Sequence, residues 1–204
     1  MYITAEYIST TLFSPYGSII SPDEEVERLA TKRGYVENNA NQGTAIKISS
    51  VSTIQNISTS HVPNINIFRC FVKETIPKTE GFSVVVPVLE KHPNTSQTFI
   101  PIGSCRNDVS HVVVVALPDP HNNDEPDLCT LRAFLCKGNQ GVTYGVGVWH
   151  APMITLAMTS DTKFVDFAVV IYEVQDKDHP ELNCIERYYR DPPQIVINKV
   201  GEDY

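Results

Sequence analysis

His111-Val112-Val113-Val114-Val115-Ala116-Leu117 is the stretch that decides the fold, because it is an apolar run about as long as one strand. It is far too short to cross a bilayer as a helix. The residues that follow, Pro118-Asp119-Pro120-His121-Asn122-Asn123-Asp124-Glu125-Pro126-Asp127, contain three prolines and many Asp and Asn residues. They predict an exposed loop rather than a strand. A second strand is expected directly afterwards, at residues 130–136.

Short runs rich in Val, Ile, Phe and Thr recur throughout the chain from residue 43 onward, and Gly, Pro, Asn and Asp separate them. Many short strands without intervening helical periods predict an antiparallel sandwich or barrel. We therefore expect one mainly β domain over residues 1–204, with a few peripheral helices. The further strands are expected near residues 44–50, 65–72, 82–90, 97–102, 142–148, 153–158 and 164–173.

Helical signals are concentrated near the N-terminus. Ser21-Pro22-Asp23-Glu24 predicts a helix start, with Ser21 as the cap, Pro22 in the first helical position and Glu24 completing a capping box. That helix should end near Lys32 and Gly34. Residues 1–13 suit a first helix or strand, and residues 194–200 are expected to add an edge strand or to pack on a partner chain.

The composition excludes several classes of partner. Sixteen basic and 24 acidic residues give a net charge of −8, which disfavours nucleic acid and, more weakly, an anionic membrane surface. The first residues lack the pattern of a secretory signal. Five cysteines, an odd number with no C-x-x-C pair, argue against a disulfide framework and favour a reduced cytoplasmic location.

Two motifs carry candidate chemistry. The first is Leu89-Glu90-Lys91-His92-Pro93 with Ser96-Gln97-Thr98-Phe99-Ile100-Pro101, a hairpin that can bring an imidazole and an amide to one mouth of a barrel. The second is Gly138–Met153, in which the only Trp directly precedes His150 after a Gly-rich turn. Glycines permit a sharp corner or a close approach to a ligand. His92 also fits a simple role as a turn cap.

Taken in order, these motifs resemble the ureidoglycolate lyase family, in its fungal form. The matching strings are Leu89–Pro93 with Gln97–Pro101, Pro126–Leu128 with Leu131–Phe134, Gln140–Tyr144 with Val148–Met153, and upstream Asn41–Ala45 and Phe68–Phe71. The similarity runs from about Phe13 to Tyr189, which is nearly the whole chain.

The resemblance implies a cupin-type double-stranded β-helix (a jelly-roll barrel), a homodimer and a place in allantoin degradation. The implied reaction is the cleavage of (S)-ureidoglycolate to glyoxylate and urea. Bacterial members often carry a His just after the Tyr that matches Tyr144, whereas this chain has Gly145. Any mechanism that needs this extra imidazole is therefore in doubt for this chain.

That reaction needs a base for the hydroxyl proton, an acid for the departing nitrogen and a cation for the substrate carboxylate. We assign the proton transfers to His92 and His150 without deciding which accepts and which donates. Arg69 is the candidate for the carboxylate, because its planar fork matches two oxygens. Arg132 is the second choice, with a salt bridge to the acidic 118–127 loop as its other possible role.

The remaining side chains of the motifs would shape the pocket. Gln97 could read the ureido group through its amide. Tyr144 and Trp149 would wall the site, although large aromatics on strands are more often part of a core. Some family members depend on a divalent metal such as nickel. If one is present, His92, Gln97 and His150 are the nearest ligands, with Glu90 completing the set. A metal-free mechanism is equally compatible with the sequence.

Three rival functions remain open from the sequence. One is a different cupin enzyme, which would need three His and a carboxylate around a metal. Another is a non-catalytic binding domain on the same fold. A third is a hydrolase that acts on the same substrate and releases ammonia in place of urea.

Overall fold

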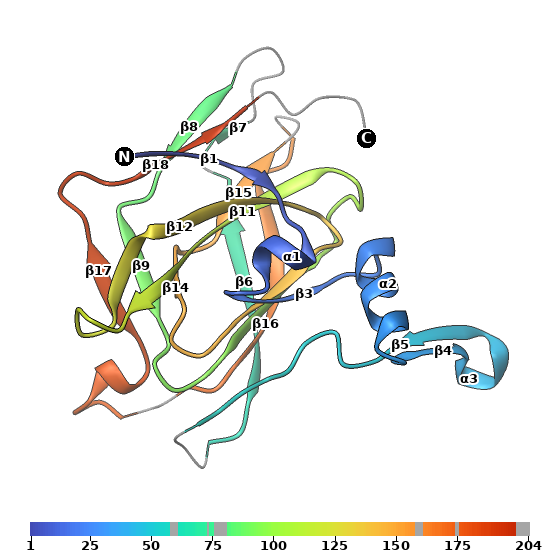
Figure 1. Ribbon diagram of the computed structural model, residues 1–204. Coiled ribbons are helices and arrows are strands. Elements are labelled where there is room, and N and C mark those ends of the chain that lie inside the picture. The colour runs from blue at the N-terminus through green and yellow to red at the C-terminus, as the bar shows by residue number, and fades with distance from the viewer. Residues whose placement is uncertain (58–60, 73, 76–80, 158–160, 174–175, 199–204) are drawn as a thin grey trace.

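The computed structural model describes residues 1–57, 61–72, 74–75, 81–157, 161–173 and 176–198. Two large sheets face each other in a jelly-roll sandwich, and the prediction of a mainly β chain with few helices is confirmed (Figure 1). The helical elements are peripheral: α1 (Thr10–Phe13), α2 (Glu24–Lys32), α3 (Ala40–Gly43) and the short 3-10 turn η1 (Pro180–Leu182).

One large sheet has five strands, in the order β3 (Gly17–Ile20), β13 (Gly141–Tyr144), β10 (Gln97–Ile102), β16 (Phe164–Ile171) and β6 (Asn64–Phe71). The other runs β17 (Ile185–Tyr188), β9 (Val88–Lys91), β14 (Trp149–His150), β11 (Val109–Asp119), β12 (Glu125–Lys137) and β2 (Glu6–Tyr7). Two further strands, β15 (Ile154–Ala157) and β7 (Glu74–Thr75), extend this second sheet from β11. We call it the central sheet.

Two small sheets complete the fold. A three-stranded sheet contains β1 (Tyr2–Thr4), β18 (Gln194–Ile197) and β8 (Phe82–Val85), and a hairpin contains β4 (Val36–Asn39) and β5 (Ala45–Ile48). β18 lies between β1 and β8. The expectation of an edge strand at the C-terminus was therefore wrong, because β1 covers its second side; residues 199 and 200 lie outside the described part.

The central sheet is buried on both faces, and β11 shows why. Val113 and Val115 pack into an inner core against the five-stranded sheet, whereas Val112, Val114 and Ala116 pack into an outer core with the three-stranded sheet. Successive strand residues point to opposite faces, so a continuous apolar run suits a strand with a core on each side. The fold-deciding stretch is therefore the middle layer of the molecule.

Several predicted boundaries needed correction. β11 continues to Asp119 and β12 begins at Glu125, so only residues 120–124 form the tip of this hairpin. Prolines were wrongly taken to exclude a strand here. Pro118 and Pro126 lie opposite each other beyond the part of β11 that pairs with β14. No strand of the described residues pairs with the other side of β11 there, so no N–H is needed for a ladder.

The expected strand 82–90 is two strands in different sheets, and the break falls at Pro87. The expected strand 142–148 ends at Tyr144, and the chain turns through Gly147, whose φ is +73°, before β14. α2 begins at Glu24 after Asp23 rather than with a capping box, because the Asp23 carboxylate accepts hydrogen bonds from the side chains of Asn139 and Gln140. The predicted end of this helix at Lys32 is confirmed.

Candidate active site

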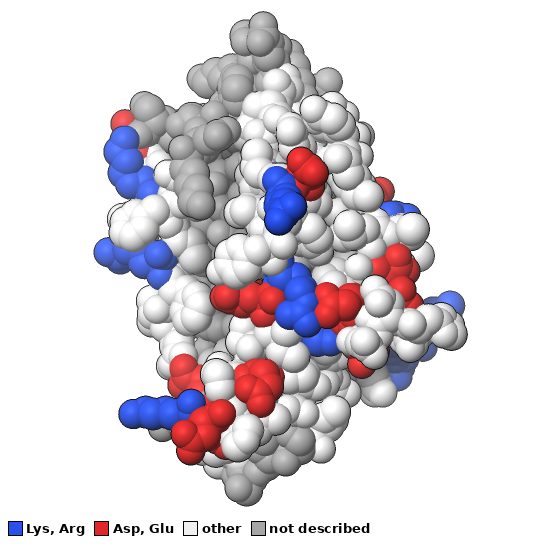
Figure 2. Space-filling view, turned by 90° about the vertical axis from the view of Figure 1, so that its left-hand side faces the viewer, with Lys and Arg blue, Asp and Glu red and all other residues white. Residues whose placement is uncertain are grey.

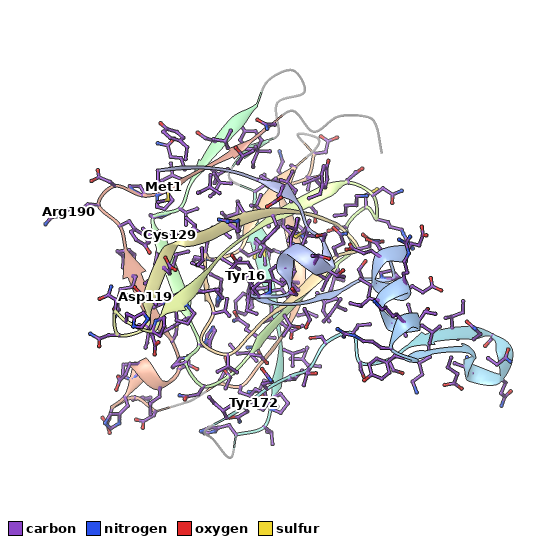
Figure 3. The ribbon with its side chains drawn as sticks, viewed as in Figure 1. Met1, Tyr16, Asp119, Cys129, Tyr172 and Arg190 are labelled. Carbon is purple, nitrogen blue, oxygen red and sulfur yellow. The ribbon has the colours of Figure 1, made fainter. Side chains whose placement is uncertain are left out.

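Strand register places the site residues at one end of the inner core. His150 on β14 lies opposite Glu90 on β9, so both side chains share the inner face of the central sheet. His92 follows β9 two residues after Glu90, which returns its side chain to the same face. Across the core, Gln97 on β10 lies opposite Tyr144 on β13. Figure 3 draws the side chains that fill the inner core, in which Tyr16 is labelled.

These groups converge closely. Glu90, His92 and His150 each offer one ligand atom within 4.8 Å of the others. Nε2 of His150 lies 3.1 Å from Oε1 of Gln97 and 3.6 Å from Oε1 of Glu90. The two imidazole rings stack with their centroids 5.7 Å apart, and the Tyr144 ring stacks on His150 at 4.1 Å. We call Glu90, His92, Gln97 and His150 the polar cluster.

A backbone carbonyl lies beside Nδ1 of each imidazole. Nδ1 of His92 lies 2.7 Å from the carbonyl oxygen of Asn183, and Nδ1 of His150 lies 3.1 Å from that of Val148. A carbonyl can only accept, so the N–H group of His92 is at Nδ1 and its Nε2 carries a lone pair. His150 has a second acceptor, Oε1 of Gln97 at 3.1 Å from Nε2, and its neutral ring can donate to only one of the two oxygens. The Nε2 atom of His92 is buried and makes no close hydrogen bond among the described residues, while the neighbouring Gln97 side chain acts to raise the pKa of this imidazole.

The polar cluster is therefore rich in electron pairs that point to one place. Nε2 of His150 faces two oxygen atoms, and a proton or a metal cation between these three atoms would remove their mutual repulsion. Imidazole nitrogens whose Nδ1–H is bound to a carbonyl, with a carboxylate and an amide oxygen beside them, are a donor set that suits a divalent transition metal. The residues present thus fit such an ion.

Burial determines the protonation of the polar cluster. It lowers the pKa of His150 to about 3, with a further lowering from nearby His92, and it also lowers the pKa of His92 itself. Burial and then the charge of Glu186 raise the pKa of Glu90 to about 7. At neutral pH both imidazoles are neutral, and Glu90 is close to half protonated.

The structure brings Glu90, His92, Gln97, Tyr144 and His150 together, as expected, but places three other predicted residues elsewhere. Arg69 on β6 is paired with Asp166 through two hydrogen bonds of 2.9 Å, near the far end of β10 from Gln97. Trp149 alternates with His150 and packs in the outer core.

Arg132 lies opposite Val115, on the inner face two strands from His150. Its guanidinium donates to the carbonyl oxygens of Leu131 and, at 3.5 Å, Cys129. The acidic 118–127 segment instead pairs with Arg187, which donates two hydrogen bonds to Glu125.

Sequence reasoning missed Asn183, Val148 and Glu186. The first two act through backbone carbonyls, which every residue has, so no side-chain pattern marks them. Glu186 lies opposite Glu90 on β17 and could be placed only from the strand order.

None of the described helices is long and apolar enough to cross a membrane. The fold and the polar cluster together define a jelly-roll protein with a small, buried acid–base or metal centre. The comparisons with known proteins give the family. The family model described as "Ureidoglycolate lyase" matches residues 1–196.

Curated relatives support the same assignment. The chain is 47% identical over 201 residues to the ureidoglycolate lyase of Saccharomyces cerevisiae, covering 96% of this chain and 98% of that protein. It is 34% identical over 160 residues to the Schizosaccharomyces pombe enzyme of the same name, covering 76% and 78%. The Pseudomonas syringae pv. tomato relative is 28% identical over 196 residues, covering 96% and 95%. This chain belongs to the ureidoglycolate lyase family.

The raised pKa of Glu90 predicts a pH-dependent stability. Its folded-state pKa of about 7 exceeds the ordinary value of 4.5, so the stabilisation from the neutral carboxyl is present below pH 4.5 and is lost as the pH rises through 7. Relative to the wild type, Glu90→Gln should gain up to about 3 kcal/mol in unfolding free energy between pH 5 and 8. Urea unfolding of chelator-treated protein measures this difference.

Exposed Glu37 provides the matched control, because Glu37→Gln should show no such trend. A difference between Glu90→Gln and the wild type that stays constant over this pH range would contradict the assignment.

Proposed function

We propose that this chain is a lyase that cleaves (S)-ureidoglycolate to glyoxylate and urea. The observation that carries the proposal is the pair of buried, neutral imidazoles of His92 and His150 beside a carboxyl group whose pKa is near 7. Membership of the ureidoglycolate lyase family and the 47% identity to a named lyase support the choice of substrate.

The reaction eliminates urea from the substrate and moves one proton from the hydroxyl oxygen to the departing nitrogen. The hydroxyl O–H bond breaks, its electron pair forms the aldehyde C=O bond, the carbon–nitrogen bond breaks, and the departing urea nitrogen gains a proton. A neutral imidazole can accept the first proton at neutral pH, because burial lowers the pKa of both His92 and His150. No net proton is consumed, so the polar cluster only has to move one proton from oxygen to nitrogen.

The other contacts follow from the same geometry. We propose that Gln97 binds the ureido group, because its amide already lies 3.1 Å from His150. Tyr144 would support the imidazole through its stacked ring. The substrate carboxylate still needs a positive charge, and Arg69 is occupied by Asp166. Arg132 stays a candidate for this role because its register places it two strands from His150, and its exposed side chain would have to turn toward the polar cluster.

A divalent cation is the other source of that charge. Glu90, His92, Gln97 and His150 would hold it, and when bound it would supply positive charge for the substrate carboxylate and acidify the hydroxyl group. Nickel is the ion that the family resemblance suggests. The His and Gln side chains would in that case position the ion.

The first test is the identity of the nitrogen product. Purified protein should release urea and glyoxylate in equal amounts from one enantiomer of ureidoglycolate, and His92→Asn and His150→Asn should each lower kcat about 10²–10⁴-fold. Exposed His121 supplies the control variant His121→Asn, which should keep full activity. Ammonia as the main product would indicate a hydrolase, and no turnover would favour a binding protein or another enzyme.

Metal binding gives a second, separate test. Calorimetric titration of chelator-treated protein with nickel should show one site per chain, and His92→Asn or His150→Asn should weaken binding at least about tenfold. His179, which pairs with Asp176 at the surface, is the control, and His179→Asn should bind as the wild type does. Equal nickel affinity in all variants would show that the polar cluster does not hold the ion.

We also propose that the fold is a cupin-type double-stranded β-helix and that the chain acts in the cytoplasm in allantoin degradation. All five cysteines are free, which suits a reducing compartment. Cell fractionation of the tagged chain would test the location.

A homodimer is the expected assembly. The edge strand β6 exposes Ile65, Ile67 and Phe71 on its outer face, with 74%, 63% and 69% of their surfaces accessible. An open strand edge with apolar side chains is a ready surface for a second copy of the chain. We propose that two chains pair here.

Light scattering should give twice the 22.8 kDa of one chain. Ile67→Lys should halve that mass, whereas Ile46→Lys on the exposed β4–β5 hairpin should leave it unchanged. A monomeric wild type, or an Ile67→Lys variant that stays dimeric, would rule out this surface.

A further inference from the structure

The two strands that carry the polar cluster have a second face, which the reaction does not use. Glu90 and His92 point to the inner core, so Lys91 between them points to the outer side of the central sheet. On the neighbouring strand, His150 points inward and Trp149 points outward into the outer core. Each site strand therefore has one outward side chain directly next to a site residue.

Both outward side chains end on the same atom. The ammonium group of Lys91 donates a 2.8 Å hydrogen bond to the carbonyl oxygen of Asp124, and the indole N–H of Trp149 donates another 2.8 Å bond to that oxygen. A carbonyl oxygen has two lone pairs, so one oxygen can accept both bonds. Asp124 lies in the tip of the β11–β12 hairpin, far along the chain from both donors.

The hairpin tip is shaped to present this carbonyl. Asn123 and Asp124 both adopt left-handed backbone conformations, with φ of 52° and 55°. Such conformations are unfavourable for residues other than glycine, and Asn and Asp tolerate them best. The backbone N–H groups of Asn122 and Asp124 donate to the carbonyl oxygen of Asp119, which closes the tip. Figure 3 labels Asp119 at the start of this turn.

An ion pair fixes the tip to the next strand. Glu125 accepts two hydrogen bonds of 2.5 Å from Arg187 on β17, the strand on the other side of β9. Acidic and basic side chains are interleaved across the middle of the face that carries β17 and this hairpin (Figure 2). The tip therefore contacts β17 through this ion pair, in addition to its contacts with β9 and β14.

Direct pairing of the two site strands is slight. β14 has only two residues, and its register with β9 is the single pair of His150 and Glu90. One further backbone hydrogen bond, from the N–H of Gly147 to the carbonyl oxygen of His92 at 2.9 Å, joins the segments just beyond this pair. This pair sets the separation of the catalytic groups, since His150 Nε2 and Glu90 Oε1 lie 3.6 Å apart. An error of about 1 Å in such a distance can cost about 100-fold in rate. Another constraint on the two strands is therefore valuable here.

Packing alone does not explain why a lysine is buried at position 91. Only 7% of its surface is exposed, and its ammonium lies 4.7 Å from the centre of the Trp149 ring. Burying a charged amine is costly unless it is bound, and an apolar side chain would fill the same space without that cost. The contact with Trp149 and the bond to Asp124 are what the charge provides.

We propose that the β11–β12 tip is a brace for the active site, in which the Asp124 carbonyl joins β9 to β14 through Lys91 and Trp149. In this arrangement Lys91, Asp124 and Trp149 are positioning residues that keep Glu90, His92 and His150 at working separation. They touch neither substrate nor metal. The inference rests on the proposed lyase function only for its kinetic consequence.

The backbone offers the sharpest test. Asp124→Gly keeps the carbonyl and favours the left-handed conformation, so kcat for ureidoglycolate should stay within about twofold of the wild type. Asp124→Pro fixes φ near −65° and removes the N–H bonded to Asp119, so the carbonyl is displaced. Its kcat should fall about 10- to 100-fold while KM changes less than about threefold. Equal kcat in both variants would overturn the brace.

The two donors should act as one unit. Lys91→Met and Trp149→Phe each remove one bond and keep most of the packing volume, and each should lower kcat about tenfold. The kcat of the double variant should lie within about twofold of that of the slower single variant. The reason is that either substitution alone already breaks the connection between β9 and β14 through the Asp124 carbonyl. Multiplied effects would show independent roles and overturn the proposal. Lys47→Met, at an exposed position, is the matched control with unchanged kinetics.

Hydrogen exchange separates this inference from the proposed function. In Lys91→Met and Asp124→Pro, the amides of residues 88–92 and 148–151 should exchange about tenfold faster, while those of β6 keep their wild-type rates. This result needs no turnover, so it stands even if the wild type fails to release urea. Unchanged exchange at both strands would overturn the brace, whatever the kinetics show.

Discussion

The constraint on which the rest of the structure depends is that the central sheet has a core on each side. A strand turns successive side chains to opposite faces, so every second residue of β11 enters the inner core and the others enter the outer core. The same alternation applies to β9 and β14. It sends Glu90 and His150 to the reaction side, and it sends Lys91 and Trp149 to the opposite side. The backbone of the central sheet therefore separates the residues of the polar cluster from the side chains that hold their strands in place.

Burial gives the polar cluster its chemical character. Imidazoles in water are half charged near pH 6.5, whereas those of His92 and His150 have lowered pKa values and stay neutral. The same desolvation acts in the opposite direction on Glu90, since it penalises the charged form of any group. Neutral bases and a partly protonated acid therefore coexist at neutral pH. Among the described residues no Lys or Arg pairs with Glu90, and the imidazole at 3.6 Å from its carboxyl group, that of His150, is neutral.

The sequence was informative where local pattern determines structure. The strand runs, the end of α2 and the convergence of His92, Gln97 and His150 were predicted, because strand periodicity and the ordered motifs place these residues. The Pro-rich 118–127 segment was wrongly excluded from strands, since composition does not reveal that two prolines can face each other at an unpaired edge.

Long-range pairing was out of reach of the sequence. Arg69 fits a carboxylate well, but its partner Asp166 lies 97 residues away in the chain and occupies its fork. The carbonyl of Asn183 that sets the tautomer of His92 lies 91 residues away, and a carbonyl has no signature in sequence. Trp149 was expected to wall the pocket, and only the strand register shows that it points to the other side.

The position of Trp149 allows the intrinsic fluorescence of the protein to report on the region behind the active site. The chain has one tryptophan, so all its indole emission comes from a ring next to His150 in the chain and fully shielded from water. The ring is hydrogen-bonded to the hairpin tip and lies close to two cations, Lys91 and Arg187. A change in the wavelength or intensity of that emission therefore reports on the contact of Trp149 with Lys91 and the Asp124 carbonyl, and no added label is needed.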